Sequence, residues 1–181
     1  MWWLAGAALA APQGWEVLQS EQVAVRCQGL EAPTFRCEAS AVLAAPPDTV
    51  WQLVRDPARF PEVFPSIDGA TVRADGRYDV AVSLPWPLPA WPLVVEATVF
   101  DGARQLALAD VGGGKGVWDR AEIEVHPHAQ GSELRWAWTG RPLVGWLHRR
   151  VQKTYGHNTV WAVAQALDVT PRAPGLATDA G

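Results

Sequence analysis

The sequence predicts one α+β domain in which a curved antiparallel sheet wraps around a long C-terminal helix, with two short helices after the first strands. Three observations lead to this prediction. An alternating strand pattern runs into two helical segments broken by prolines, further alternating runs follow closely, and one long helical pattern ends the domain. A chain of 181 residues is the size of a single domain.

One predicted strand and the two short helices that follow it lie between residues 37 and 65. Apolar residues share one parity over residues 37–43, as one face of a half-buried strand requires. Pro46 and Pro47 end the strand and suit the first turn of a helix, and Val50, Trp51 and Val54 recur at helical spacing. Asp56 precedes Pro57 and is biased out of the helical region, so a bend separates this helix from a second apolar turn.

Period-2 runs follow, and turn signals at Asp101-Gly102, at residues 112–116 and at Gln130-Gly131 separate several of them. The residues that share a parity are Tyr78, Val80, Val82, Leu84 and Trp86; Leu93, Val95, Ala97 and Val99; Leu106 and Leu108; Val117, Ala121, Ile123 and Val125; and Leu134, Trp136 and Trp138. Closely spaced strands of this kind predict an antiparallel meander.

Pro142 introduces a helix that we expect to reach about Asp168. Its apolar stripe contains Leu147, Val151, Tyr155 and Asn158 among other residues, while His148, Arg149, Gln152, Lys153 and His157 take the other side. Because a single sheet must bury one face, this helix is the element expected to cover it.

Four short motifs, in order, resemble the START-like helix-grip superfamily, which includes START lipid-transfer domains, small polyketide cyclases and coenzyme-Q-binding proteins. They are Ala45-Pro46-Pro47 with Val50-Trp51, Asp56 and Phe60-Pro61; Pro85-Trp86-Pro87-Leu88; Gly116-Val117-Trp118; and Arg141-Pro142-Leu143 with Trp146-Leu147. The resemblance covers residues 15–167, within a domain of residues 15–168. Ala90-Trp91 stands near the place where START members commonly show an Arg-Asp pair.

This resemblance implies a ligand cavity between the sheet and the helix, and therefore binding of a hydrophobic small molecule, most naturally a lipid. The expected cavity walls are Leu84, Trp86, Trp136, Trp138, Leu147 and Val151, with Tyr155 and Asn158 as polar contacts. Two features also have a purely structural alternative, which stays open. The 11 Trp form either an aromatic cavity wall or a close-packed core, and the two polar side chains either meet a ligand or bond to strand residues.

An aromatic polyketide cyclase is the rival interpretation, and a ubiquinone-binding chaperone is another alternative. A cyclase needs a buried acid or base, yet Arg120, Glu122 and Glu124 alternate away from the apolar face of their strand. We expect no catalytic residues, no cofactor and no metal site. His126-Pro127-His128 has no third ligand at a recognised spacing, and the glycines of residues 112–116 lack the spacing of a phosphate loop.

The charge of the chain bears on its partners. A net charge of −4, with no long basic run, argues against nucleic acid as a partner. Basic residues gather before and along the last helix, at Arg141, His148, Arg149, Arg150 and Lys153. They permit transient contact with an anionic membrane surface, although a solvated helix face is the simpler interpretation. We expect a monomer.

Residues 1–11 and two cysteines indicate the compartment. The uncharged segment 1–11 ends in Ala8-Leu9-Ala10, a pattern that a signal peptidase accepts. Cys27 and Cys37 lie at strand parity across a predicted hairpin, which brings two Cα atoms within reach of a disulfide. We favour a disulfide-bonded, exported protein, periplasmic or secreted. Two buried thiols in a cytoplasmic protein are the alternative. Residues 169–181 are expected to form a disordered tail.

Overall fold

The computed structural model describes residues 15–19, 22–29, 34–83, 90–112, 119–140 and 145–174. The strands are β1 (Trp15–Gln19), β2 (Ala24–Gly29), β3 (Phe35–Leu43), β4 (Ile67–Val72), β5 (Tyr78–Val82), β6 (Trp91–Phe100), β7 (Gln105–Asp110), β8 (Arg120–His128) and β9 (Gly131–Gly140). The helices are α1 (Pro47–Val54), the 3-10 turn η1 (Pro57–Arg59), α2 (Phe60–Val63), the 3-10 turn η2 (Asp101–Ala103) and α3 (Gly145–Ala166).

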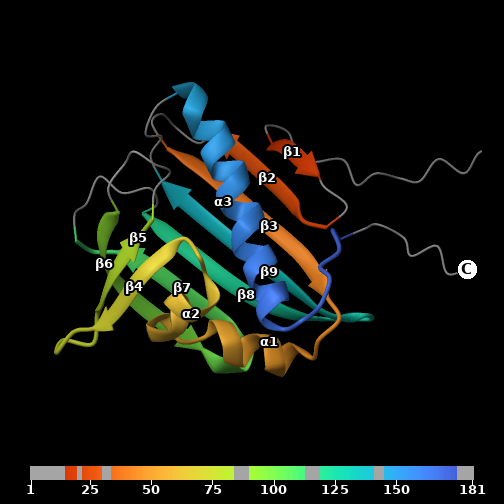
Figure 1. The fold of residues 1–181 in the computed structure, drawn as a ribbon, viewed down its shortest axis with the longest axis horizontal. Helices are drawn as coiled ribbons and strands as arrows, with labels where there is room; N and C mark the ends of the chain where they lie inside the picture. Colours follow the sequence, from red (N-terminus) through yellow and green to blue (C-terminus); the bar gives the residue numbers. More distant parts are fainter. Residues whose placement is uncertain are drawn as a thin grey trace, which may run out of the picture.

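The described strands form one antiparallel sheet in the order β1-β2-β3-β9-β8-β7-β6-β5-β4. The helix α3 crosses one face of this sheet over β2, β3 and β9, while α1 and α2 lie near the far end of α3 (Figure 1). We call the face under α3 the inner face and the opposite face the outer face. The predicted α+β architecture, with a curved sheet around a long C-terminal helix, is confirmed.

The proline breaks act as predicted. Pro47 is the first residue of α1, whose Val50, Trp51 and Val54 are buried. Asp56 has an extended backbone and its carboxylate accepts a hydrogen bond from the Ala58 amide at 3.0 Å, which starts the turn η1. Because a residue before a proline is biased out of the helical region, the chain turns at Asp56, and α2 then packs near β4 and α3.

A disulfide joins Cys27 and Cys37, as predicted. These residues are direct cross-strand partners in the β2–β3 pair, with Cα atoms 4.1 Å apart. On its other side Cys37 pairs with Trp138 of β9. The disulfide therefore ties the β2 end of the sheet to the strands that carry α3.

The end of the chain corrects the predicted disordered tail. Arg172 forms an isolated bridge with Val42, in which each backbone amide donates to the other residue's carbonyl at 2.7 and 3.0 Å, and Ala173 is buried. The strand β2 begins opposite Ser40, so the last residues of β3 have a free edge, and this segment fills it. The correction covers residues 169–174, since 175–181 lie outside the described residues, as does the candidate signal peptide 1–11.

Two strands were not predicted. The strand β1 pairs with β2, and β4 pairs with β5 at the opposite edge of the sheet. The sequence of β4, Ile-Asp-Gly-Ala-Thr-Val, contains three residues that are depleted in strands, so its propensity is low. Its pairing with β5 outweighs that propensity.

Reduction of the Cys27–Cys37 bridge should lower the free energy of unfolding by about 2–3 kcal/mol, because the bridge restricts a short loop of the unfolded chain. Urea denaturation of the oxidised protein and of a Cys27→Ser, Cys37→Ser double variant measures this difference. Equal midpoints for the two proteins would show that the pairing of β2 with β3 suffices without the bond.

Candidate functional site

The interior contains an aromatic cluster that joins α2, β9 and α3. We define it as Phe60, Phe64, Trp136, Trp138 and Tyr155. Ring centroids lie 5.0 Å apart in the Phe60–Phe64 pair, 5.1 Å in Phe64–Trp136 and 5.5 Å in Trp138–Tyr155, with edge-to-face geometry. Such pairs add packing energy beyond the area they bury. The two tryptophans predicted as cavity walls therefore lie on the inner face, against helix residues.

Trp138 holds α3 against the sheet in two ways. Its Nε1–H donates a buried hydrogen bond to Oε1 of Gln152 at 2.6 Å. One turn further along the helix, Gly156 lies directly over the indole: a Cβ atom at this position would stand 2.5 Å from Cη2 of Trp138 and 3.1 Å from Cβ of Ala39. Glycine therefore sets how closely α3 approaches β3 and β9.

The helix face facing the sheet differs from the predicted stripe. Gln152 is 2% exposed and Thr159 3% exposed, whereas Asn158, predicted as a polar contact, is exposed. The prediction assigned Gln152 to the solvent side because of its polarity. It is buried because Trp138 offers it a hydrogen-bond donor, and this pairing rotates Asn158 away from the interior. Tyr155 lies beside the two tryptophans, and its role as a polar contact to a ligand stays a prediction.

The structure does not describe the side chains of four other predicted wall residues. Leu84 and Trp86 lie outside the described residues. Leu147 and Val151 belong to the first half of α3, of which the structure describes the backbone.

The inner face of β5–β8 is apolar and lies beside the strands that α3 crosses. Its buried residues are Val80, Val82, Leu93, Val95, Leu106, Leu108, Ala121, Ile123 and Val125. Tyr78, opposite Val95 in the register, lies half-buried at the rim of this surface. Burial raises the pKa of its phenol, and the negative charge of Asp56 adds to the increase.

The outer face is charged, and its ion pairs run across β2, β3, β8 and β9. Arg26 pairs with Glu38 at 2.8 Å, and Arg36 lies 3.6 Å from Glu122. A hydrogen bond to Glu133 raises the pKa of the Arg135 guanidinium. These pairs are partly exposed, and pairs of that kind contribute little to stability. They keep the outer face polar.

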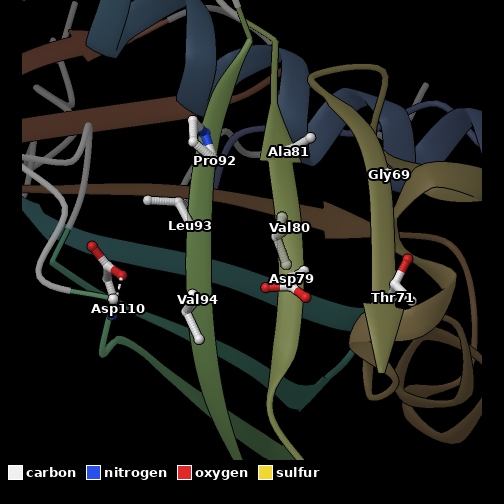
Figure 2. A pocket seen from close by; sticks show the side chains of 10 residues that line it. Gly69, Thr71, Asp79, Val80, Ala81, Pro92, Leu93, Val94 and Asp110 are labelled. Atoms are coloured by element: carbon white, nitrogen blue, oxygen red, sulfur yellow. Dashed lines mark hydrogen bonds between the residues drawn. The ribbon is translucent and has the colours of Figure 1, made fainter. Parts of the chain in front are cut away.

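A hollow of about 630 Å³ also lies on the outer face, across β4, β5 and β6. Figure 2 shows these three strands side by side, with Asp79 and Thr71 on two of them and Asp110 beside the third. The buried neighbours Val80 and Leu93 point to the inner face, so this hollow is separated from the aromatic cluster by the sheet itself. Its lining is too open and mixed to be the cavity expected from the sequence.

The fold and its apolar inner face can now be compared with known proteins. Residues 34–168 match the model of a family described as polyketide cyclase / dehydrase and lipid transport. The chain belongs to this family. A search of curated protein sequences finds no significant match.

Solved structures of similar fold include a STAR-related lipid transfer protein from Xanthomonas axonopodis. It is 20% identical, with a TM-score of 0.69 over 86% of this chain and 99% of the other. A START superfamily protein from Mycobacterium smegmatis is 13% identical, with a TM-score of 0.59 over 75% of this chain and 97% of the other. The Zhui aromatase/cyclase from a Streptomyces species is 12% identical, with a TM-score of 0.56 over 75% and 94%.

Members of this polyketide cyclase and lipid transport family bind hydrophobic small molecules. In this member the sequence indicated the two tryptophans and Tyr155 but missed Phe60 and Phe64 as their partners. Phe60-Pro61 and Phe64-Pro65 were visible as an apolar turn, and that repeat was the available signal. Within the described residues no helix is long and apolar enough to cross a bilayer, and no three metal-ligating side chains come together.

Replacement of Gly156 by Leu should destabilise the protein by about 3 kcal/mol, because the new side chain must displace a buried, hydrogen-bonded indole. Gly102→Leu is the matched control. A Cβ at Gly102 meets nothing within 4 Å, so that variant should stay within about 0.5 kcal/mol of the parent. Thermal melts of the two variants make the comparison, and equal losses would show that α3 does not rest on Trp138.

Replacement of Gln152 by Leu should cost about 1–3 kcal/mol, since it leaves the Trp138 N–H buried without its acceptor. A double-mutant cycle with Trp138→Phe isolates the hydrogen bond. Gln165→Leu, at an exposed position of the same helix, serves as the control. Additive losses in the cycle would contradict a direct bond between the two side chains.

Proposed function

We propose that this protein binds a hydrophobic small molecule, most naturally a lipid, between the inner face of β5–β8 and α3. The family description includes lipid transport, and one relative of similar fold is named a lipid transfer protein. Both support the proposal, while the identity of the ligand and its transfer between membranes are separate questions.

The observation that carries the proposal is an apolar inner face that continues beyond the strands crossed by α3. The helix α3 packs over β2, β3 and β9, α1 contacts β8 and β9, and α2 contacts β4. Next to the strands that α3 crosses, the inner faces of β5–β8 form one continuous apolar surface, and its side chains are buried. Removing about 400 Å² of an apolar ligand from water would contribute about 10 kcal/mol, before the loss of translational freedom and of side-chain entropy. Binding by apolar contact needs no reaction.

A cyclase-type enzyme is the second candidate, because a relative of similar fold is named an aromatase/cyclase. The charged residues of β8 do not favour it. Ala121, Ile123 and Val125 point inward and are buried, so Arg120, Glu122 and Glu124, which alternate with them, stand on the outer face. We therefore propose binding without catalysis. A ubiquinone-binding chaperone would be one special case of this function, and we propose the broader class.

We propose further that the protein is exported and acts as a monomer. The Cys27–Cys37 disulfide is typical of an oxidising compartment, which supports a periplasmic or secreted location. Brief contact with a membrane surface would allow the protein to load or release its ligand.

The proposal predicts that Ala97→Phe weakens binding of a fluorescent fatty acid or sterol analogue by at least about tenfold, a change of about 1.4 kcal/mol. Ala97 lies on the inner face opposite Leu108, where a larger ring would occupy ligand space. Ala107→Phe is the control, since Ala107 pairs with Thr98 on the outer face. Fluorescence titration measures affinity, and thermal melts of both variants check folding.

Native mass spectrometry of gently purified protein provides an independent test, because a bound ligand would be seen by its mass. Absence of any co-purifying molecule, together with no melting shift from a panel of lipids, quinones and aromatic polyketides, would overturn the proposal. The aromatic cluster would then be a close-packed core.

A further inference from the structure

One tryptophan in the aromatic cluster carries a buried hydrogen-bond donor that nothing satisfies. Trp136 is 2% exposed, and its Nε1 has no hydrogen-bond partner among the residues that the structure describes. The other buried indoles differ. Trp138 donates to Gln152 at 2.6 Å, and Trp51 donates to Asp101 at 2.9 Å.

A buried donor without an acceptor is costly, and native proteins satisfy nearly all such groups. Ser132 Oγ is the other unsatisfied buried atom in the described parts of the chain. Ser132 lies at the β8–β9 hairpin. Its neighbour Gly131 passes close to the backbone of β3. Trp136 instead stands near the middle of β9, the strand next to β8, so its donor borders the region proposed for the ligand.

Among the described residues, no neighbour of Trp136 accepts a hydrogen bond from its Nε1. Its cross-strand partners are Ala39 and Ile123, and the rings of Phe60, Phe64 and Tyr155 lie 5.1–6.4 Å from its own. The nitrogen exposes less than 1 Å², so bulk water does not contact it in this arrangement of the rings. The acceptor would therefore belong to a molecule that also makes apolar contacts with the surrounding rings.

We propose that Trp136 Nε1–H donates a hydrogen bond to the bound ligand, which fixes the ligand class. The ligand has an apolar body and a neutral hydrogen-bond acceptor, such as a carbonyl, ester or ether oxygen, at the end that enters deepest. A carboxylate is disfavoured, because a charge placed among these rings would lose its hydration without a counter-ion. This inference rests on the proposed function.

Entry of the acceptor requires one neighbouring ring to move. Phe60 and Phe64 are 2% and 1% exposed, whereas Tyr155 is half-buried and is the most exposed of the three rings. Its ring sits 6.4 Å from Trp136 and 5.5 Å from Trp138, between the two indoles and the helix. Tyr155 therefore acts as the movable wall over the donor, and Trp138 stays fixed by Gln152.

The first experiment observes the indole N–H directly in ¹⁵N-labelled protein. Loss of one peak in Trp136→Phe assigns the Trp136 indole signal in the proton–nitrogen spectrum. Addition of methyl nonyl ketone should move this peak downfield, as hydrogen bonding does. The Trp51 peak, assigned with Trp51→Phe and already bonded to Asp101, should stay in place.

The second experiment compares two probes of equal shape by their melting shifts: methyl nonyl ketone, and the hydrocarbon in which a methylene group replaces its carbonyl oxygen. For each protein we compare the affinity for the ketone with the affinity for the hydrocarbon. This ratio should be about fivefold larger in the parent protein than in Trp136→Phe, as expected for one net hydrogen bond. A Trp136 residue replaced by benzothienylalanine, which lacks the N–H but keeps the shape, should abolish the same preference without a change in packing.

The outcomes separate the two ideas. Binding of both probes with an unchanged ketone preference in the variants, or with no shift of the Trp136 peak, overturns the donor role and leaves lipid binding intact. Failure of both probes to bind the parent protein overturns the donor role together with the proposed site.

Discussion

The contact between α3 and Trp138 is the constraint on which the interior depends. The Gln152 side chain accepts the indole hydrogen bond at 2.6 Å, and Gly156 allows the helix backbone to rest on the same ring. Together they fix both the rotation and the distance of the helix. Once the rotation is fixed, Tyr155 must lie beside the two tryptophans and Asn158 must face solvent. Trp138 is also flanked within the sheet by its two cross-strand partners, Cys37 of β3 and Ala121 of β8.

Much of the fold follows from the sequence because its signals are local. Prolines 46, 47 and 57 define the helix starts, and the alternation of Cys37 to Leu43 defines the strand before them. Strand β4 escaped prediction because Asp68, Gly69 and Ala70 have low strand propensity, and its existence depends on β5. The segment around Arg172 was missed for the same reason, since its partner Val42 lies far away in the sequence.

The candidate site was harder to predict, because a helical stripe is assigned by polarity. Trp136, Trp138 and Tyr155 were found since aromatic side chains favour the interior. Gln152 was placed on the wrong face, as a long amide is usually solvated and only a tertiary donor can reverse that preference. No pattern in the sequence could show that Trp138 obtains an acceptor while Trp136, two residues earlier on the same face, does not.

The sheet thus has two halves with different mechanical roles. Strands β2, β3 and β9 carry the disulfide, the close contact at Gly156 and the bridge from Arg172, so opening them would break several interactions at once. The inner face of β5–β8 is held mainly by apolar contact, which is non-directional. Local opening takes place where the fewest specific bonds must break. The ligand that we propose would therefore enter over β5–β8, while the anchored half keeps α3 in place.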